Sequence, residues 1–163
     1  MTHITTIRVE SPSFTDQGWI PQKHTGYGED ISPAFQLFGV SEQGVSLVVI
    51  LVDLDVPFHK EYPHWLIWNI PKMEQIPEGI PHGAILPEFG NACQGMAYGK
   101  NCYRGPKPPV FLPNPHQYVF RFFVLDCFLD LPSSAKKREL FKAMQGHILQ
   151  QGSICGTYKY QRS

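Results

Sequence analysis

Two aspartates and two histidines lie close together in the segment Leu51–Trp65, between two hydrophobic runs. Asp53 and Asp55 are two positions apart at the end of the first run, and His64 opens the second run. Residues i and i+2 of a strand point to the same face, so both carboxylates can leave the strand on one side. Such a cluster is compatible with a metal site, an acid/base pair or an anion pocket.

A second histidine and a tyrosine begin another hydrophobic run further along the chain. His116 starts the run HQYVFRFFVLD, and Tyr118 shares its strand face. If the sheet places the end of one strand beside the starts of two others, Asp53, His64 and His116 meet at one rim of that sheet. The spacing therefore predicts a polar pocket at this rim.

Each of these residues also has a purely structural interpretation. An Asp-x-Asp sequence at the end of a strand typically accepts backbone N–H bonds in a turn. A histidine at a strand edge is typically a hydrogen-bonded packing residue, and Tyr118 can be a core aromatic residue with a satisfied hydroxyl. Spacing alone leaves both interpretations open.

The segment YRGPKPP, Tyr103–Pro109, favours the pocket interpretation. Its three prolines and one glycine indicate a rigid loop with few backbone donors. The N–H groups of Gly105 and Lys107 remain, and donors that are held in place can face an anion. Together with the two histidines and the tyrosine, this loop predicts a pocket rich in hydrogen-bond donors.

The elements that position these residues are predicted to be mostly β-strands, in keeping with 14 Gly and 15 Pro in the chain. The runs at Leu47–Val52 and Leu66–Ile70 are apolar at odd and even positions alike, which predicts strands covered on both faces. A helix is expected only near the C-terminus, where Ser133 or Ser134 can cap it. A terminal strand is expected after Gly152.

The composition predicts one globular domain spanning residues 1–163. Charged residues make up 17% of the chain and the formal net charge is +0, which argues against a nucleic-acid-binding protein. The first residues lack the pattern of a secretory signal, and no apolar run approaches the roughly 20 residues that span a bilayer. Four cysteines without a CxxC pair favour reduced thiols, so we expect a cytoplasmic protein.

Several motifs, in this order, resemble the phosphatidylethanolamine-binding protein family, and more closely its bacterial Raf kinase inhibitor-like branch. These motifs are DLDVP, HWLIWNIP, YRGPKPP and HQYVF, flanked by EDISPAFQL and GHILQQGSICGTY. The resemblance extends over roughly Gly28–Tyr160. It implies a mostly β protein, an antiparallel β-sandwich with a short C-terminal helix and a small pocket for phosphate-like anions.

Motif by motif, the resemblance also implies a set of ligand-binding residues. They are Asp53, Asp55, Pro57, His64, Gly105, Lys107, Pro108, His116 and Tyr118. A cis peptide between Val56 and Pro57 is a further expectation. The chain departs from the bacterial pattern in QGMAYGK, which lacks the usual Arg and Asn, and at Lys107, which adds a cation at the expected mouth of the pocket.

The resemblance and the pocket chemistry predict a non-enzymatic binding protein for phosphate or phosphorylated head groups, with no cofactor, metal or catalytic residue. Asp53 is expected to orient His64 and the proline-rich loop, while histidines and backbone N–H groups hold the anion. Regulation of a protein partner such as a kinase or protease is compatible with this prediction, as is a homodimer. The alternative is a hydrolase or metal-dependent enzyme that uses Asp53, Asp55, His64 and His116. The sequence contains no HExxH, no GxSxG and no glycine-rich phosphate loop before a helix to support that alternative.

Overall fold

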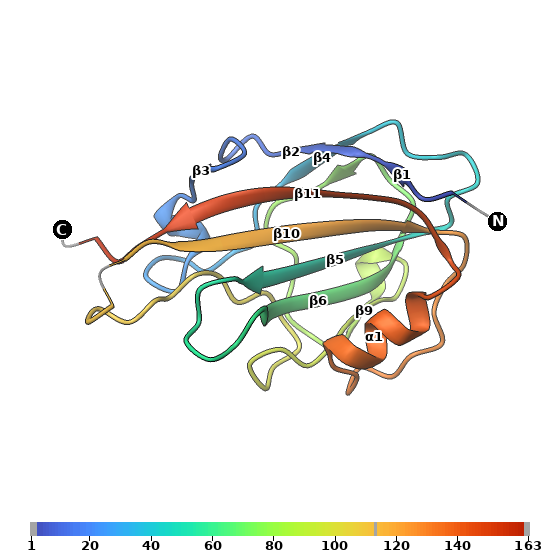
Figure 1. Cartoon of the computed structure of the whole chain (residues 1–163). Helices are drawn as coiled ribbons and strands as arrows, with labels where there is room; N and C mark the ends of the chain where they lie inside the picture. The colour runs from blue at the N-terminus through green and yellow to red at the C-terminus, as the bar shows by residue number, and fades with distance from the viewer. Residues whose placement is uncertain (1–2, 113, 162–163) are drawn as a thin grey trace.

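The strand that the sequence predicts at the centre of the molecule, β5 (Ser46–Asp53), is buried along its whole length. The computed structural model describes residues 3–112 and 114–161, so residues 1, 2, 113, 162 and 163 of the predicted domain lie outside the description. β5 pairs in antiparallel fashion with β6 (Tyr62–Pro71) on one side and β10 (His116–Leu125) on the other (Figure 1). Their many β-branched and aromatic residues suit a pleated sheet that is covered on both faces.

These three strands belong to a large mixed sheet with the order β1-β11-β10-β5-β6-β9-β8. Its outer members are β1 (Thr5–Thr6), β3 (Gly18–Trp19), β8 (Ile85–Leu86), β9 (Ala92–Gln94) and β11 (Ile148–Tyr158). β1 and β3 both run parallel to β11, while the other neighbours among the described strands are antiparallel. A small antiparallel sheet has the order β2-β4-β7, made of β2 (Arg8–Glu10), β4 (Phe35–Phe38) and β7 (Gln75–Ile76).

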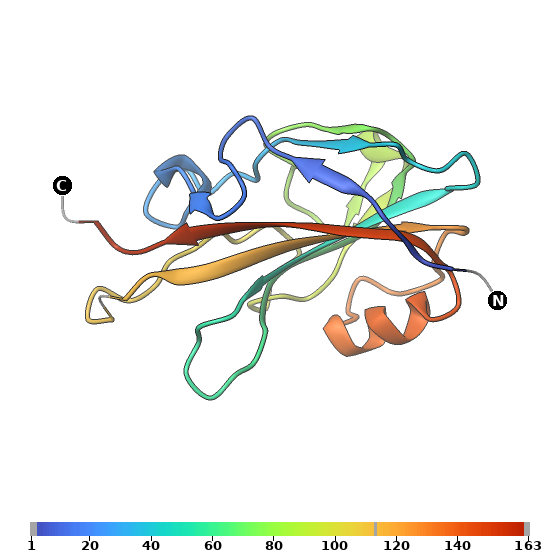
Figure 2. The same ribbon diagram turned by 45° about the horizontal axis from the view of Figure 1, so that its top comes forward.

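The two faces of the large sheet are covered by different parts of the chain (Figure 2). The apolar side chains at odd positions of β5 lie in a core that includes Phe35 and Leu37 of the small sheet. Those at even positions pack in a second core with Leu140 and Met144 of the helix α1 (Lys137–Met144). The prediction of a mostly β fold with a helix near the C-terminus is confirmed. The predicted antiparallel sandwich differs in one respect, because β1 and β3 run parallel to β11 and make the large sheet mixed.

The start of α1 differs from the predicted one. Its N-cap residue is Lys136, which makes no capping hydrogen bond through its side chain. Ser133 and Ser134 lie in a separate turn before that residue, so the prediction that one of them caps the helix is wrong. Two single-turn 3-10 helices, η1 (Gln22–His24) and η2 (Pro87–Phe89), occur earlier in the chain.

The last strand is longer than predicted, because β11 begins at Ile148 and contains Gly152 instead of following it. A Cβ atom on Gly152 would lie 2.1 Å from the carbonyl oxygen of Ile7. The glycine therefore permits the backbone before β2 to approach the strand, where the N–H of Ile7 donates to the carbonyl oxygen of Gln151 at 2.9 Å. The sequence pattern identified this glycine as a break, whereas it is a point of close packing.

All four cysteines, Cys93, Cys102, Cys127 and Cys155, are free. Within residues 3–112 and 114–161, no helix has the length and apolar character needed to cross a membrane.

Candidate functional site

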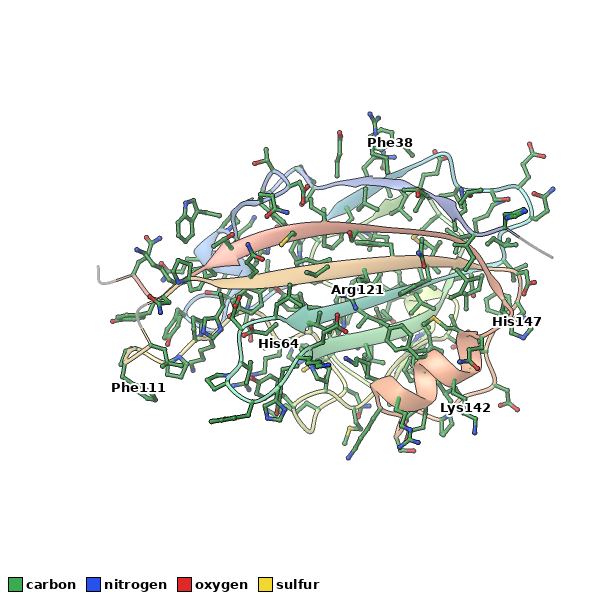
Figure 3. The ribbon with its side chains drawn as sticks, in the orientation of Figure 1. Phe38, His64, Phe111, Arg121, Lys142 and His147 are labelled. Carbon is green, nitrogen blue, oxygen red and sulfur yellow. The ribbon has the colours of Figure 1, made fainter. Side chains whose placement is uncertain are left out.

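The end of β5 and the starts of β6 and β10 lie side by side at one end of the large sheet, near the His64 label in Figure 3. His64, His116 and Tyr118 are buried there, with 2%, 5% and 0% of their surfaces exposed. The ring centroid of Tyr118 lies 5.6 Å from that of His64 and 6.2 Å from that of His116. The structure thus brings together the three aromatic side chains that the strand pattern placed at this rim.

Asp53, the last residue of β5, orients His116 and not His64. Its Oδ2 accepts a hydrogen bond from Nδ1 of His116 at 2.9 Å, and its Oδ1 accepts one from the N–H of Asp55 at 2.8 Å. In the pairing of β5 with β10, Tyr118 lies opposite Asp53, so His116 sits just beyond the end of β5 and within reach of that carboxylate. The expectation that Asp53 orients His64 is therefore wrong.

Asp55 does not share the buried position of Asp53. Its side chain is exposed, and its Oδ2 accepts a hydrogen bond from the N–H of Gln117 at 2.7 Å. β5 ends at Asp53, so the two carboxylates are no longer on one strand face. Asp55 instead ties the loop after β5 to the start of β10.

The loop between β5 and β6 reverses without a cis peptide. No cis bond occurs in the described parts of the chain, so the expected cis Val56–Pro57 bond is wrong. The reversal is made by Phe58, which has a φ of 67°, and by the N–H of His59, which donates to the carbonyl oxygen of Val56 at 3.1 Å. Pro57 itself is exposed in this loop.

His64 has one ring nitrogen in a hydrogen bond and the other buried without a partner. Nδ1 donates to the carbonyl oxygen of Arg104 at 2.9 Å, whereas Nε2 has no partner among the described residues. Burial lowers the pKa of His64 below its ordinary value, and the opposing effects of the Arg104 bond and of Asp53 are smaller. The neutral ring carries its proton on Nδ1, so Nε2 is a hydrogen-bond acceptor.

The hydroxyl of Tyr118 is also buried without a hydrogen-bond partner in the described structure. Burial raises the pKa of Tyr118, and the nearby Asp53 carboxylate raises it further. The hydroxyl therefore stays protonated and can donate. A third unpaired polar atom, Nε1 of Trp68, belongs to the separate core beneath α1.

Gly105 in the proline-rich loop has a packing role that the sequence analysis did not predict. Its N–H donates to Oδ1 of Asp30 at 2.7 Å, so this N–H is not available to an anion. A Cβ atom at this position would lie 1.9 Å from the carbonyl oxygen of His24. A glycine is required here because the loop packs directly against the backbone carbonyl of His24.

Lys107 and Pro108 of the same loop contact the segment around Tyr27. The Tyr27 hydroxyl donates to the carbonyl oxygen of Pro108, and the alkyl chain of Lys107 packs on Gly26. The ammonium of Lys107 lies 5.8 Å from the centroid of the Tyr27 ring. These contacts hold the side chain of Lys107 beside Tyr27.

Arg104 is a cation beside the site that the sequence analysis did not single out. Its carbonyl oxygen accepts the His64 bond, and its guanidinium lies 4.3 Å from the centroid of the Tyr98 ring. The Tyr98 ring in turn lies 4.8 Å from the His64 ring, between centroids. The positive charge of Arg104 also contributes to the lowered pKa of His64. The residue precedes Gly105 in YRGPKPP, so the motif contained the signal.

The carboxylates and histidines of this site do not form a group compact enough to share one metal ion. Asp53 is bonded to His116, Asp55 points to a backbone N–H, and His64 is bonded to Arg104. Among the described residues, a compact set of three ligand atoms occurs at the other end of the sheet.

Comparisons with known proteins agree with the resemblance seen in the motifs. The family model for phosphatidylethanolamine-binding protein matches residues 10–159. A UPF0098 protein of Pyrococcus abyssi is 41% identical over 150 residues, which cover 91% of this chain and 83% of that protein. The crystal structure of a putative phosphatidylethanolamine-binding protein homologue from Chlamydia trachomatis has 29% identity and a TM-score of 0.83, with 96% of this chain and 99% of that chain covered. YbcL of E. coli has 22% identity and a TM-score of 0.82 over 96% of this chain and 100% of that chain, so it shares the fold.

Proposed function

Because this chain belongs to the phosphatidylethanolamine-binding protein family, we propose that it is a binding protein whose pocket at His64, His116 and Tyr118 takes a small phosphate-like anion. The ligand is phosphate or the phosphate of a larger molecule such as a lipid head group, and the protein binds it without transforming it. The family match supports a binding protein, and the chemistry of the buried side chains supports the ligand class.

The observation that carries this proposal is a pair of buried polar atoms, on neighbouring rings, that lack a protein partner in the described structure. Nε2 of His64 and the hydroxyl of Tyr118 are both unpaired, on rings whose centroids are 5.6 Å apart. Leaving a buried polar group unpaired costs roughly 1–3 kcal/mol. A small polar ligand that bonds to both atoms would remove this cost, which gives the site an intrinsic affinity for such a ligand.

The protonation state of the pocket determines which polar ligand suits it. Neutral His64 offers an acceptor at Nε2, and Tyr118 offers a donor. A phosphate monoester that keeps one proton can donate to Nε2 and accept from the hydroxyl. With a second pKa of about 6, this form predominates below pH 6 and is roughly a tenth of the total at pH 7. The proposal therefore favours a proton-bearing phosphate group over an anion that carries no proton.

The charges around the pocket are compatible with an anion. The Asp53 carboxylate opposes a bound anion, but its two oxygens already accept hydrogen bonds from His116 and from the N–H of Asp55. Arg104 supplies a positive charge close enough to His64 to help lower the pKa of that histidine. A cation and a fully hydrogen-bonded carboxylate reduce the repulsion that an isolated buried Asp would exert.

The test is isothermal titration calorimetry with inorganic phosphate on the parent protein, His64→Ala and the control His59→Ala. His59 is exposed in the loop between β5 and β6, so its removal changes the histidine content and not the pocket. Losing a charge-assisted hydrogen bond costs about 1.5–3 kcal/mol, so His64→Ala should bind about ten- to a hundredfold more weakly. Equal affinities of His64→Ala and His59→Ala would contradict the proposed site.

Incubation with a chromogenic phosphate monoester tests the non-enzymatic part of the proposal. We expect no release of phosphate above the rate in buffer alone. Release that is saturable and is lost in His64→Ala would show that the same pocket catalyses hydrolysis.

A further inference from the structure

Three metal-ligating side chains of different types meet at the end of the large sheet far from the pocket. Asp126 and Cys127 directly follow β10, and His147 directly precedes β11. One carboxylate oxygen, the thiol sulfur and one imidazole nitrogen all lie within 4.8 Å of one another. In Figure 3, His147 is labelled at the right end of the molecule near α1, whereas His64 is labelled left of the centre, at the start of β6.

Hydrogen bonds hold the backbone around this cluster, so the Cα positions of the three residues are fixed relative to one another. The N–H of Asp126 donates to the carbonyl oxygen of His147 at 3.0 Å. The N–H of His147 donates to the carbonyl oxygen of Met144, also at 3.0 Å. The hydroxyl of Ser46, itself fully buried, donates to the carbonyl oxygen of Cys127 at 2.6 Å. Two segments that are distant in the sequence are thereby fastened together where the ligands project.

The side chains themselves already face one another. Nδ1 of His147 is 2.9 Å from Oδ1 of Asp126, and the two atoms share one proton in a hydrogen bond. The side chains of His147 and Asp126 are 46% and 43% exposed, so an ion has access from solvent. Cys127 is half-buried next to them.

We propose that Asp126, Cys127 and His147 bind one Zn²⁺ ion. Thiolate, imidazole and carboxylate are the three ligand types that zinc prefers, at roughly 2.3, 2.0–2.1 and 2.0–2.2 Å. Tetrahedral bonds of those lengths put ligand atoms roughly 3.3–3.8 Å apart. The His147 and Asp126 atoms, now 2.9 Å apart, must therefore separate slightly, and any pair near the 4.8 Å limit must approach by about 1 Å or more. The ion replaces the proton between His147 and Asp126 and displaces the thiol proton of Cys127, and the two anionic ligands then balance its charge.

Three protein ligands leave the fourth position of a tetrahedral ion open. Water or a donor atom from another molecule fills that position, as in zinc sites that do not have a purely structural role. The site shares no residue with the pocket around His64, so it binds its ion whether or not the anion pocket is occupied.

Co²⁺ titration of untagged, reduced protein tests the proposal, because Co²⁺ substitutes for Zn²⁺ and reports a thiolate ligand by a charge-transfer band in the near ultraviolet. We expect the band to saturate at one ion per chain and to disappear when Zn²⁺ is added. Cys127→Ser should lose the band, whereas the matched control Cys155→Ser should keep it.

The other two ligands are tested in the same titration. His147→Ala and Asp126→Asn should each bind Co²⁺ at least about tenfold more weakly, since even outer-shell contacts of a metal contribute that much. His82→Ala, which removes another exposed histidine, should bind like the parent. Circular dichroism of each variant checks that the fold is intact.

Two results would overturn the inference. One is the absence of a saturable thiolate band in the parent protein, which would leave Asp126 and His147 as a surface ion pair. The other is a band that survives in Cys127→Ser, which would assign the metal to a different cysteine.

Discussion

Replacing Gly105 with alanine should destabilise the protein strongly, because the loop at this position touches the backbone of His24. The added Cβ would lie 1.9 Å from the His24 carbonyl oxygen, whereas real Cβ contacts essentially never fall below 3.0 Å. The two segments must therefore separate by at least 3.0 − 1.9 = 1.1 Å. The neighbouring atoms, Oδ1 of Asp30 and the hydroxyl of Tyr103, are each 2.8 Å away and leave no room for a sideways shift.

The expected loss follows from the hydrogen bonds that span this contact. Gly105 donates to the Asp30 carboxylate at 2.7 Å, and the Tyr103 hydroxyl donates to the His24 carbonyl at 2.6 Å. A separation of more than an ångström breaks or severely lengthens both. A bond to a charged group contributes about 1.5–3 kcal/mol and a neutral bond about 0.5–1.5 kcal/mol. The free energy of unfolding should therefore fall by about 2–4.5 kcal/mol.

Urea unfolding measured by circular dichroism gives this free energy, with Gly39→Ala as the control. Gly39 has a φ of 81° and open space around its Cα, so alanine there carries only the left-handed backbone strain of about 1–2 kcal/mol. Phosphate affinity should fall in Gly105→Ala but not in Gly39→Ala, because the moved loop carries the Arg104 carbonyl that orients His64. A loss of stability in Gly105→Ala no larger than in the control would refute the close contact.

Four other predictions concern the proposed phosphate site. Tyr118→Phe should weaken phosphate binding in calorimetry while urea unfolding shows no loss of stability, because its hydroxyl bonds to nothing in the described structure. Sulfate affinity, measured calorimetrically from pH 8 to pH 5, should rise as pH falls, since sulfate requires a protonated His64 whose pKa burial lowers below 6.5. By the same linkage, stability without ligand should decline as pH falls below about 6.5, where unfolded His64 takes up a proton before the folded form does. Asp55→Asn should leave phosphate affinity unchanged, because that exposed carboxylate bonds to the Gln117 backbone.

The central strands could be predicted from the sequence because their pattern is dictated by burial alone. β5 is apolar at every position before Asp53 except Ser46, and a strand of that kind is stable only when both of its faces are covered. The start of α1 could not be predicted in the same way. Two serines offered better caps than Lys136, but the turn they form sets the helix start after them.

The placement of the aromatic rings in the candidate site could be predicted from the sequence, whereas their hydrogen-bond partners could not. His116 and Tyr118 share a strand face by spacing, and that placement holds in β10. Which histidine Asp53 bonds to depends on the register of β5 against β10, and the sequence of either strand alone does not contain that register. The partner of the Gly105 N–H is more distant still, since Asp30 lies 75 residues earlier in the chain.

Both histidines of the pocket have Nδ1 committed to a protein acceptor, and this shared feature constrains the ligand. His64 donates from Nδ1 to a backbone carbonyl, and His116 donates from Nδ1 to the Asp53 carboxylate. On the neutral ring of His64, Nε2 is then an acceptor, and the hydroxyl of Tyr118 beside it is a donor. A ligand without protons can bond to Nε2 of His64 only after that nitrogen is protonated, and burial opposes this protonation by lowering the pKa of His64. A phosphate group that carries its own proton can donate to the neutral Nε2 of His64. Its binding therefore does not require His64 to take up a proton.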